Sequence, residues 1–133
     1  MKGHARSIMT ARVTSVSPET SLADISRLMA AGGFGGVPVV EGGRIVGFVS
    51  ETDIMDSLLD SRSSETPAAE VMSAPVITVD EFDRTEDVLR LLHEHAIHHL
   101  PVVRDGRLVG IITPSDVIRH LVEGFLPVPP EVG

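Results

Sequence analysis

The chain carries an internal repeat that covers most of its length. When the sequence is shifted by 63 positions, residues 8–58 align with residues 71–121 without a gap, and 16 of the 51 pairs are identical. The identical pairs include Met9/Met72, Asp24/Asp87, Pro38/Pro101, Gly47/Gly110 and Asp53/Asp116. Units of a solenoid contact only their neighbours, and two copies are too few to build one. The repeat therefore predicts two similar units that pack as a pseudo-twofold pair.

Both copies predict the same five elements. A short apolar piece at 13–16 or 76–79 indicates a strand, and the apolar stripe that follows it has helical spacing. The dipeptides Gly42-Gly43 and Asp105-Gly106 are typical of tight hairpin loops between two strands. A second amphipathic helix ends each copy. The expected fold class is α+β, with two β-α-β-β-α repeats packed about a pseudo-twofold axis.

The second strand of each hairpin, at 45–49 or 108–112, is apolar on both faces, so we expect it to be central and buried. Gly47 and Gly110 lie inside these strands. A glycine in a strand interior marks either a β-bulge or a place where another part of the protein approaches the backbone closely. The sequence leaves both interpretations open.

The boundaries follow from composition and from capping signals. Ser21 with Asp24, and Asp83 with Glu86, have the spacing of capping boxes and predict where the first helix of each copy begins. A polar connector separates the copies, and a Pro-rich tail that we expect to be extended follows them. The predicted units are repeat 1 at 8–59, the linker at 60–66, repeat 2 at 67–122 and the tail at 123–133.

Composition excludes several classes of function. The chain has 11 Lys and Arg against 19 Asp and Glu, a net charge of -8, no Trp or Tyr, and 4 Phe. Binding of nucleic acid needs a basic face or an aromatic platform, so no nucleic-acid partner is expected. The lack of Cys excludes thiol chemistry. No apolar run approaches the roughly 20 residues of a membrane span, and no signal core follows the start, so we expect a cytoplasmic protein without a membrane partner.

The junction between the last strand and the last helix of each copy carries the strongest chemical signal. Ser50 and Asp53 in copy one, and Thr113 and Asp116 in copy two, have the Ser/Thr-x-x-Asp spacing of an N-terminal capping box. The same geometry suits a nucleotide. The helix N-terminus and the hydroxyl would face phosphate, while the Asp would accept hydrogen bonds from two ribose hydroxyls.

Taken together, these motifs resemble the cystathionine-β-synthase (CBS) domain family, as a tandem pair over residues 8–122. The resemblance rests on both junctions and on four segments: Ile8-Met9-Thr10, Val71-Met72-Ser73, Val37-Pro38-Val39-Val40 and Leu100-Pro101-Val102-Val103. It implies two clefts between the repeats that bind AMP, ADP or ATP, and in some members S-adenosylmethionine or NAD. It also implies a regulatory module that often forms homodimers.

The resemblance assigns roles to individual residues. Asp53 and Asp116 would hold ribose hydroxyls. The residues expected to face phosphate are Ser50, Thr52, Thr113 and Ser115. Those expected at the adenine end are Ser15 and Thr78, with the backbone around Val37, Pro38, Leu100 and Pro101 contacting the base.

His98 and His99 match a position where some relatives carry a basic pair that reaches phosphate. They would serve the site whose ribose is held by Asp53, and affinity there is expected to fall as the pH rises through about 6.5. Copy one has Gly35-Gly36 at this position, which argues against strong phosphate binding at the Asp116 site. Structural or solvated histidines are the alternative. His95 and His99 are four residues apart, but no carboxylate completes a metal set, and no metal is expected. We expect Arg44 and Arg107 to be solvated.

Three functions remain to be compared. A regulatory sensor of adenosine-containing ligands accounts for both Asp residues in their matching context. A dimerisation or protein-interaction module without a physiological nucleotide is the alternative. An enzyme is disfavoured, because the sequence shows no nucleophile–base pair, Walker loop or metal set. No cofactor is expected to be required, and an effector protein acting in trans is a further expected partner.

Overall fold

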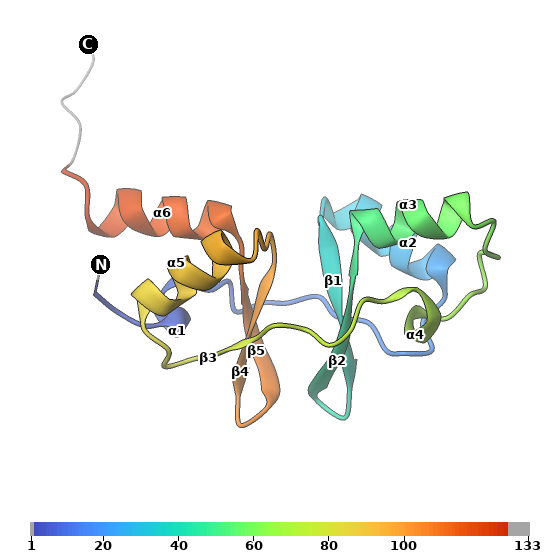
Figure 1. The fold of residues 1–133 in the computed structure, drawn as a ribbon, viewed down its shortest axis with the longest axis horizontal. Helices are drawn as coiled ribbons and strands as arrows, with labels where there is room; N and C mark the ends of the chain where they lie inside the picture. Colours follow the sequence, from blue (N-terminus) through green and yellow to red (C-terminus); the bar gives the residue numbers. More distant parts are fainter. Residues whose placement is uncertain (1, 128–133) are drawn as a thin grey trace, which may run out of the picture.

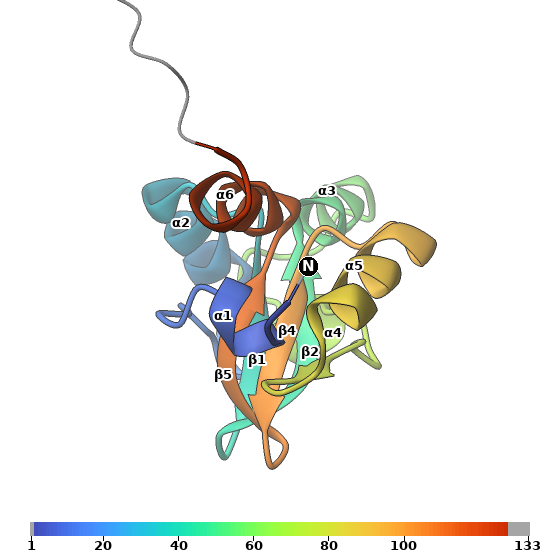
Figure 2. The ribbon, with the colours of Figure 1, turned by 90° about the vertical axis from the view of Figure 1, so that its left-hand side faces the viewer.

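The computed structural model describes residues 2–127 as two similar halves placed side by side (Figure 1; Figure 2 gives the end view). Its elements are α1 (Ala5–Ile8), α2 (Leu22–Gly32), β1 (Gly36–Glu41), β2 (Arg44–Ser50), α3 (Glu51–Leu59), α4 (Ala68–Val71), β3 (Val79–Asp80), α5 (Thr85–Glu94), β4 (Leu100–Arg104), β5 (Arg107–Ile112) and α6 (Pro114–Gly124). Helix α6 extends two residues into the predicted tail, of which residues 128–133 lie outside the described part of the chain.

Five strands form the sheet in the order β1-β2-β5-β4-β3, and the α+β fold class is confirmed. β1/β2 and β4/β5 are antiparallel hairpins, whereas β3 runs parallel to β4. The halves meet in the sheet where Arg44 of β2 pairs with Arg107 of β5. The strand predicted at 13–16 is reduced to one parallel bridge between Val16 and Val39, since only Val16 of that piece is buried.

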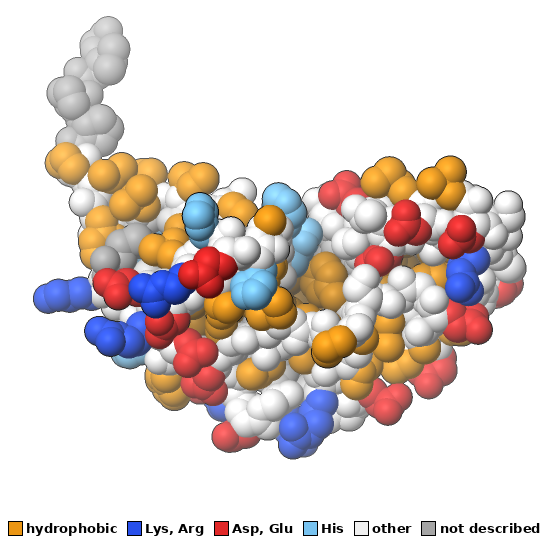
Figure 3. All heavy atoms as spheres, in the orientation of Figure 1, with side chains coloured by type: hydrophobic (Ala, Val, Ile, Leu, Met, Phe, Trp, Pro, Cys, Tyr) orange, Lys and Arg blue, Asp and Glu red, His pale blue; other side chains and the backbone are white. Residues whose placement is uncertain are grey.

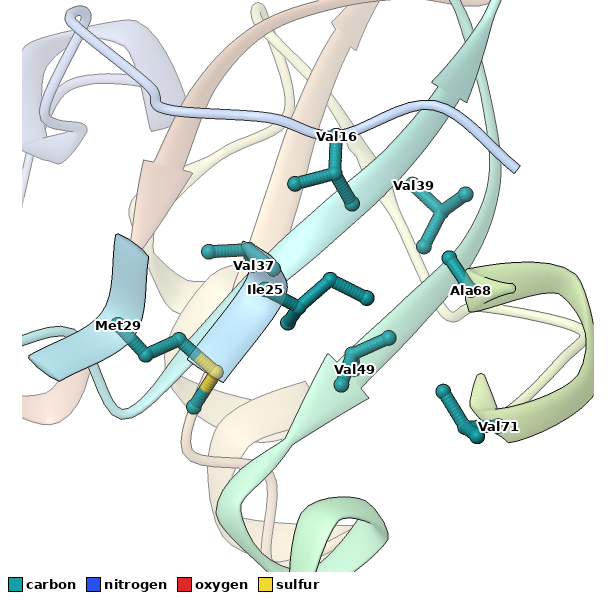
Figure 4. Packing of buried hydrophobic residues seen from close by; sticks show 8 residues of the cluster. All are labelled: Val16, Ile25, Met29, Val37, Val39, Val49, Ala68 and Val71. Atoms are coloured by element: carbon teal, nitrogen blue, oxygen red, sulfur yellow. The ribbon is translucent and has the colours of Figure 1, made fainter. Parts of the chain in front are cut away.

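The opening segment of each repeat packs against the other repeat. Ala5 and Ile8 of α1 are buried in the second hydrophobic core, whose other members include Val88 and Leu100. Figure 4 shows the reverse arrangement in the first core, where Ala68 and Val71 of α4 point toward the side chains of α2, β1 and β2. Neither core is complete without a helix from the other copy.

The second strands confirm both interpretations of their glycines. Val39 pairs with Gly47 while Val40 pairs with Ile45, so Val46 is the extra residue of a β-bulge, and Val109 of β5 occupies the same position. The glycines also allow close approach. A Cβ at Gly47 would collide with the side chain of Met72, and a Cβ at Gly110 would collide with that of Met9. Each methionine thus crosses to the other repeat.

Other local predictions met different outcomes. Ser21 caps α2 by accepting a hydrogen bond from the Asp24 backbone N–H, at 3.1 Å. The capping box predicted for Asp83 and Glu86 was wrong, because the Asp83 carboxylate instead accepts from the Asp80 backbone N–H, at 2.9 Å, and α5 begins after Arg84. The second strands, β2 and β5, are buried only in their C-terminal halves. Their N-terminal ends follow the hairpin turns, which extend beyond the helices (Figure 1).

Arg44 and Arg107 are exposed, as expected, but each also reaches across the boundary between the repeats. The Arg107 guanidinium lies where a Cβ of Gly43 would be, and that of Arg44 lies where a Cβ of Gly106 would be. Both glycines have a positive φ, 82° and 79°. A glycine is therefore required here twice, for the backbone conformation of the turn and for the crossing side chain.

Candidate functional site

The first cleft lies between the repeats beside the N-terminus of α3. Its polar end is a hollow of about 290 Å³ and its apolar end one of about 220 Å³, and the two share Phe48, Ile97 and His99 as walls. The polar end is lined further by Gly35, Ser50, Glu51, Thr52 and His98, and the apolar end by Ser73, Pro75, Val76 and Ile77. Figure 3 shows histidine side chains gathered beside the hollow between the halves.

The second cleft, of about 230 Å³, is the pseudo-twofold counterpart at the N-terminus of α6. Repeat 1 contributes Thr10, Arg12, Val13, Thr14, Phe34, Gly36 and Pro38, and repeat 2 contributes Ile111, Thr113, Ser115, Asp116 and Arg119. Phe34 and Ile111 correspond to Ile97 and Phe48 of the first cleft at the shift of 63 residues. Both clefts therefore combine a helix N-terminus from one repeat with an opening segment from the other.

Asp53 connects the helix to the opening segment of repeat 2. Its Oδ2 accepts hydrogen bonds from the Ser50 backbone N–H at 2.8 Å and from the Ser50 hydroxyl at 3.0 Å. Its Oδ1 accepts from the Ser73 hydroxyl at 2.8 Å. A carboxylate oxygen has two lone pairs, so Oδ1 retains room for one more donor.

Asp116 is almost fully buried and is more heavily engaged. Its Oδ2 accepts from the Thr113 backbone N–H at 2.8 Å and from the Thr113 hydroxyl at 3.0 Å. Its Oδ1 accepts from the Thr10 hydroxyl at 2.9 Å and forms an ion pair with Arg119. All four lone-pair positions are occupied, so a ribose diol that placed both hydroxyls on Oδ1 would have to replace both Thr10 and Arg119.

The capping interpretation of both junctions is confirmed. The Ser50 and Thr113 hydroxyls accept hydrogen bonds from the backbone N–H groups of Asp53 and Asp116, at 3.2 Å and 3.3 Å. The two carboxylates in turn accept from the backbone N–H groups of Ser50 and Thr113. The capping role is compatible with ligand binding, because the capping hydrogen bonds hold the hydroxyl and the carboxylate next to the helix N-terminus at the cleft.

His99 forms one wall of the first cleft. Its ring lies 5.1 Å from that of Phe48, centroid to centroid, and its Nε2 would be 3.1 Å from a Cβ at Gly35. Burial lowers the pKa of His99 and the neighbouring His98 lowers it further, while the Glu51 carboxylate opposes the shift. The titration of His99 therefore moves to lower pH, and at neutral pH it offers a phosphate a hydrogen bond rather than a charge.

The structure brings most of the sequence-predicted residues to the clefts. Ser50, Thr52, His98 and His99 line the first, and Pro38, Thr113, Ser115 and Asp116 line the second. Asp53 does not line the first cleft itself, but it accepts a hydrogen bond from Ser73, which does. Val37, Leu100 and Pro101 are fully buried, which leaves only their backbone to meet a ligand.

Other predicted or overlooked residues lie around these sets. Ser15 and Thr78 fall just beyond the opening segments that line the clefts. Sequence reasoning missed Glu51, Ser73, Thr10, Arg12 and Arg119. The hydroxyl pair at Thr10 and Ser73 is visible in the repeat, but which copy each would contact is not.

Within residues 2–127 no helix has both the length and the apolar character needed to cross a bilayer. In the same part of the chain, no group of three or more His, Asp and Glu side chains is placed to hold a metal ion.

Two repeats that exchange their opening segments and enclose paired clefts define a tandem domain pair. The CBS domain family matches residues 5–60 and 68–123, and the chain belongs to this family, with two CBS domains in tandem.

Similar proteins agree with this assignment. A CBS domain-containing protein, YhcV, of Bacillus subtilis is 34% identical over 110 residues, which cover 82% of this chain and 79% of the relative. The crystal structure of CBSX2 in complex with AMP superposes with a TM-score of 0.82 at 30% identity, covering 90% of this chain and 96% of that one. The Hypoxic Response Protein I structure, with two coordinated zinc ions, also gives 0.82 at 30% identity, covering 94% and 100%.

Proposed function

We propose that this CBS pair is a non-catalytic regulatory module that binds adenosine-containing ligands of the AMP, ADP and ATP class in its two clefts. The observation that carries the proposal is the composition of each cleft. In the second cleft the capped N-terminus of α6 and the Asp116 carboxylate face Val13 of repeat 1. In the first, the capped N-terminus of α3 faces Val76 of repeat 2, and Asp53 accepts a hydrogen bond from Ser73 of the same lining. The AMP complex of CBSX2 supports the ligand class.

The parts of an adenosine ligand match the parts of the first cleft. Pro75, Val76 and Ile77 offer an apolar surface to the base. The ribose diol would donate to Asp53, whose Oδ1 accepts a hydrogen bond from Ser73 of the same lining. Phosphate would lie toward Ser50 and Thr52, where the helix N-terminus favours an anion. S-adenosylmethionine and NAD contain the same adenosine part and belong to the same proposal.

Regulation follows from the position of the clefts between the repeats. A ligand that touches both repeats stabilises the arrangement that fits it, and the shift in population is limited by its difference in affinity for the two arrangements. An effector protein acting in trans would respond to that arrangement. The cytoplasmic location expected from composition stays a prediction.

A ligand panel tests the proposed function. Thermal unfolding should be measured with adenosine, AMP, ADP, ATP, S-adenosylmethionine and NADH, and at least one should raise the midpoint. A ligand at about 100 times its dissociation constant adds roughly 2.7 kcal/mol of stability. In the double variant Asp53→Asn/Asp116→Asn the rise should disappear. The amide oxygen can keep the cap hydrogen bonds that Oδ2 accepts, but the NH2 group then replaces Oδ1, and it cannot accept a hydrogen bond from the diol.

The matched control is Asp56→Asn, an exposed carboxylate on the same helix as Asp53. It should leave the ligand-induced rise intact. If the control and the double variant respond equally, or if no adenosine compound stabilises the wild type, the proposed function is wrong.

An exposed apolar face favours a second role, homodimerisation. The α3–α6 face consists of Met55, Leu58, Leu59, Ile118 and Val122, all more than half exposed. Figures 1 and 2 show α3 and α6 along the same edge, and Figure 3 shows hydrophobic side chains on it. Soluble monomers rarely leave a large apolar patch uncovered.

A second copy of the chain is the partner that fits this face. Met55 corresponds to Ile118, and Leu59 to Val122, at the shift of 63 residues, so the face has the pseudo-twofold symmetry of the pair. A surface with that symmetry can pair with itself about a twofold axis. We infer that two copies associate through α3 and α6.

Sedimentation velocity tests the dimer. The wild type should sediment as a dimer at micromolar concentration, and Leu59→Asp/Val122→Asp should sediment as a monomer, because two charges per chain would enter the interface. Phe82→Asp is the control, since Phe82 is 55% exposed but lies outside the α3–α6 face. A monomeric wild type, or a double variant that stays dimeric, would contradict this interface.

A further inference from the structure

The two clefts differ in charge at three matching positions. Arg12 of the second cleft corresponds to Pro75 of the first at the shift of 63 residues. Arg119 lines the second cleft, whereas its counterpart Asp56 does not line the first. In the opposite sense, Glu51 of the first cleft corresponds to Pro114. Each exchange makes the second cleft more positive, so the pseudo-twofold symmetry of the backbone does not extend to the electrostatics.

The second cleft holds two arginines near its helix N-terminus. Arg12 lines the cleft, is exposed, and forms no ion pair within the described residues 2–127. Arg119 lines the same cleft and is paired with Asp116. A guanidinium is charged at every physiological pH and can bind phosphate oxygens through two parallel N–H groups.

The first cleft holds a carboxylate where the second has none. Glu51 is the first residue of α3 and lines the polar end of the cleft. Its Oε1 would be 3.2 Å from a Cβ at Gly35, and the His99 Nε2 would be 3.1 Å from the same Cβ, so the carboxylate and the His99 ring both border Gly35 at the polar end. The cationic partners available there are His98 and His99, and burial favours the neutral form of His99.

We propose that the clefts select different ligands: the Asp116 cleft binds an adenosine ligand with a chain of two or more phosphates, and the Asp53 cleft binds one with a single phosphate or none. This inference rests on the proposed function and specifies its ligands. It reverses the order expected from Gly35-Gly36 and His98-His99, because that expectation did not include the arginines.

The hydrogen bonds of Asp116 describe how binding would proceed. Arg119 and Thr10 occupy the two acceptor positions of Oδ1, which a ribose diol needs. When the diol takes these positions, the Arg119 guanidinium is released next to the phosphate chain, where Arg12 already lies. The phosphate chain then becomes the partner of the released guanidinium. The Asp116 carboxylate keeps the hydrogen bonds from the Thr113 backbone N–H and hydroxyl and gains those of the diol.

Calorimetric titrations with the sodium salts of AMP, ADP and ATP, and with adenosine, test the inference in EDTA-containing buffer. In Asp53→Asn, where the Asp116 cleft remains, affinity should rise at least about tenfold from AMP to ATP and fall with added NaCl, as expected for phosphate held by arginine. Adding Arg12→Gln should weaken ATP about tenfold and leave adenosine unchanged. Arg62→Gln, an exposed arginine outside the clefts, should change neither.

The reverse background tests the other cleft. In Asp116→Asn, ATP should bind no more tightly than AMP, and Glu51→Gln should improve ATP selectively. If no adenosine compound binds the wild type, the proposed function itself fails. If ligands bind but affinity is independent of phosphate number in both backgrounds, or Arg12→Gln weakens adenosine and ATP equally, the function stands and this inference is overturned.

Discussion

The Ala68→Glu substitution is expected to lower the free energy of unfolding by about 4 kcal/mol or more, which approaches the whole stability of a domain of this size. Ala68 belongs to the opening helix of repeat 2, yet it is fully buried in the core of repeat 1. Its backbone N–H also donates to the Thr20 carbonyl at 2.8 Å. A carboxylate at this position would be buried without a partner.

Ala69→Glu is the matched control, because the neighbouring side chain is exposed on the same short helix. It should change stability by no more than about 0.5 kcal/mol. Urea unfolding followed by circular dichroism measures both. Equal effects of the two variants would show that α4 does not pack into repeat 1, and would contradict the exchange of opening segments.

The Gly47→Val substitution is expected to give the second large change in stability. Strand propensity and the packing against Met72 predict opposite signs for this change. Strand propensity favours Val over Gly, so propensity alone predicts a gain in stability. The structure predicts a loss of about 1–3 kcal/mol, since a side chain at this position collides with Met72. Thermal unfolding should therefore show a lower midpoint in Gly47→Val than in the wild type.

Two further variants make this result specific. Met72→Ala should recover part of the loss when it is combined with Gly47→Val, because it removes the colliding atoms. Gly124→Ala, at a position with no heavy atom within 4 Å of the added Cβ, should be close to neutral. A stabilised Gly47→Val variant, or one that Met72→Ala does not rescue, would contradict the close approach of the two repeats.

The repeat alignment predicted much of the fold because the two copies report the same pattern independently. It predicted both hairpins, both capped junctions and the pairing of the copies. It could not predict that Ala5 and Ala68 exchange cores, since hydrophobic periodicity shows which residues are buried but not against which partner. The same limit applies to the bulges at Val46 and Val109, where one extra residue in a strand leaves the apolar pattern intact.

The clefts show a similar division. The carboxylates and hydroxyls were predicted because they recur in both copies at a spacing with a physical meaning. Arg12 and Arg119 were missed because the other copy has no arginine at the matching position. A search for residues that the two copies share does not find positions at which they differ. The charge asymmetry becomes visible only when the structure shows which positions of the repeat line a cleft.

The central claim is that the two clefts bind adenosine-containing ligands, and calorimetric titration of the wild-type protein with AMP, repeated with ATP, tests it most directly. The account predicts saturable binding of at least one compound, with no more than two molecules per chain, and its loss in Asp53→Asn/Asp116→Asn at unchanged circular dichroism. A folded wild-type protein that binds neither compound at millimolar concentration would contradict the claim and leave association through the α3–α6 face as the role to pursue.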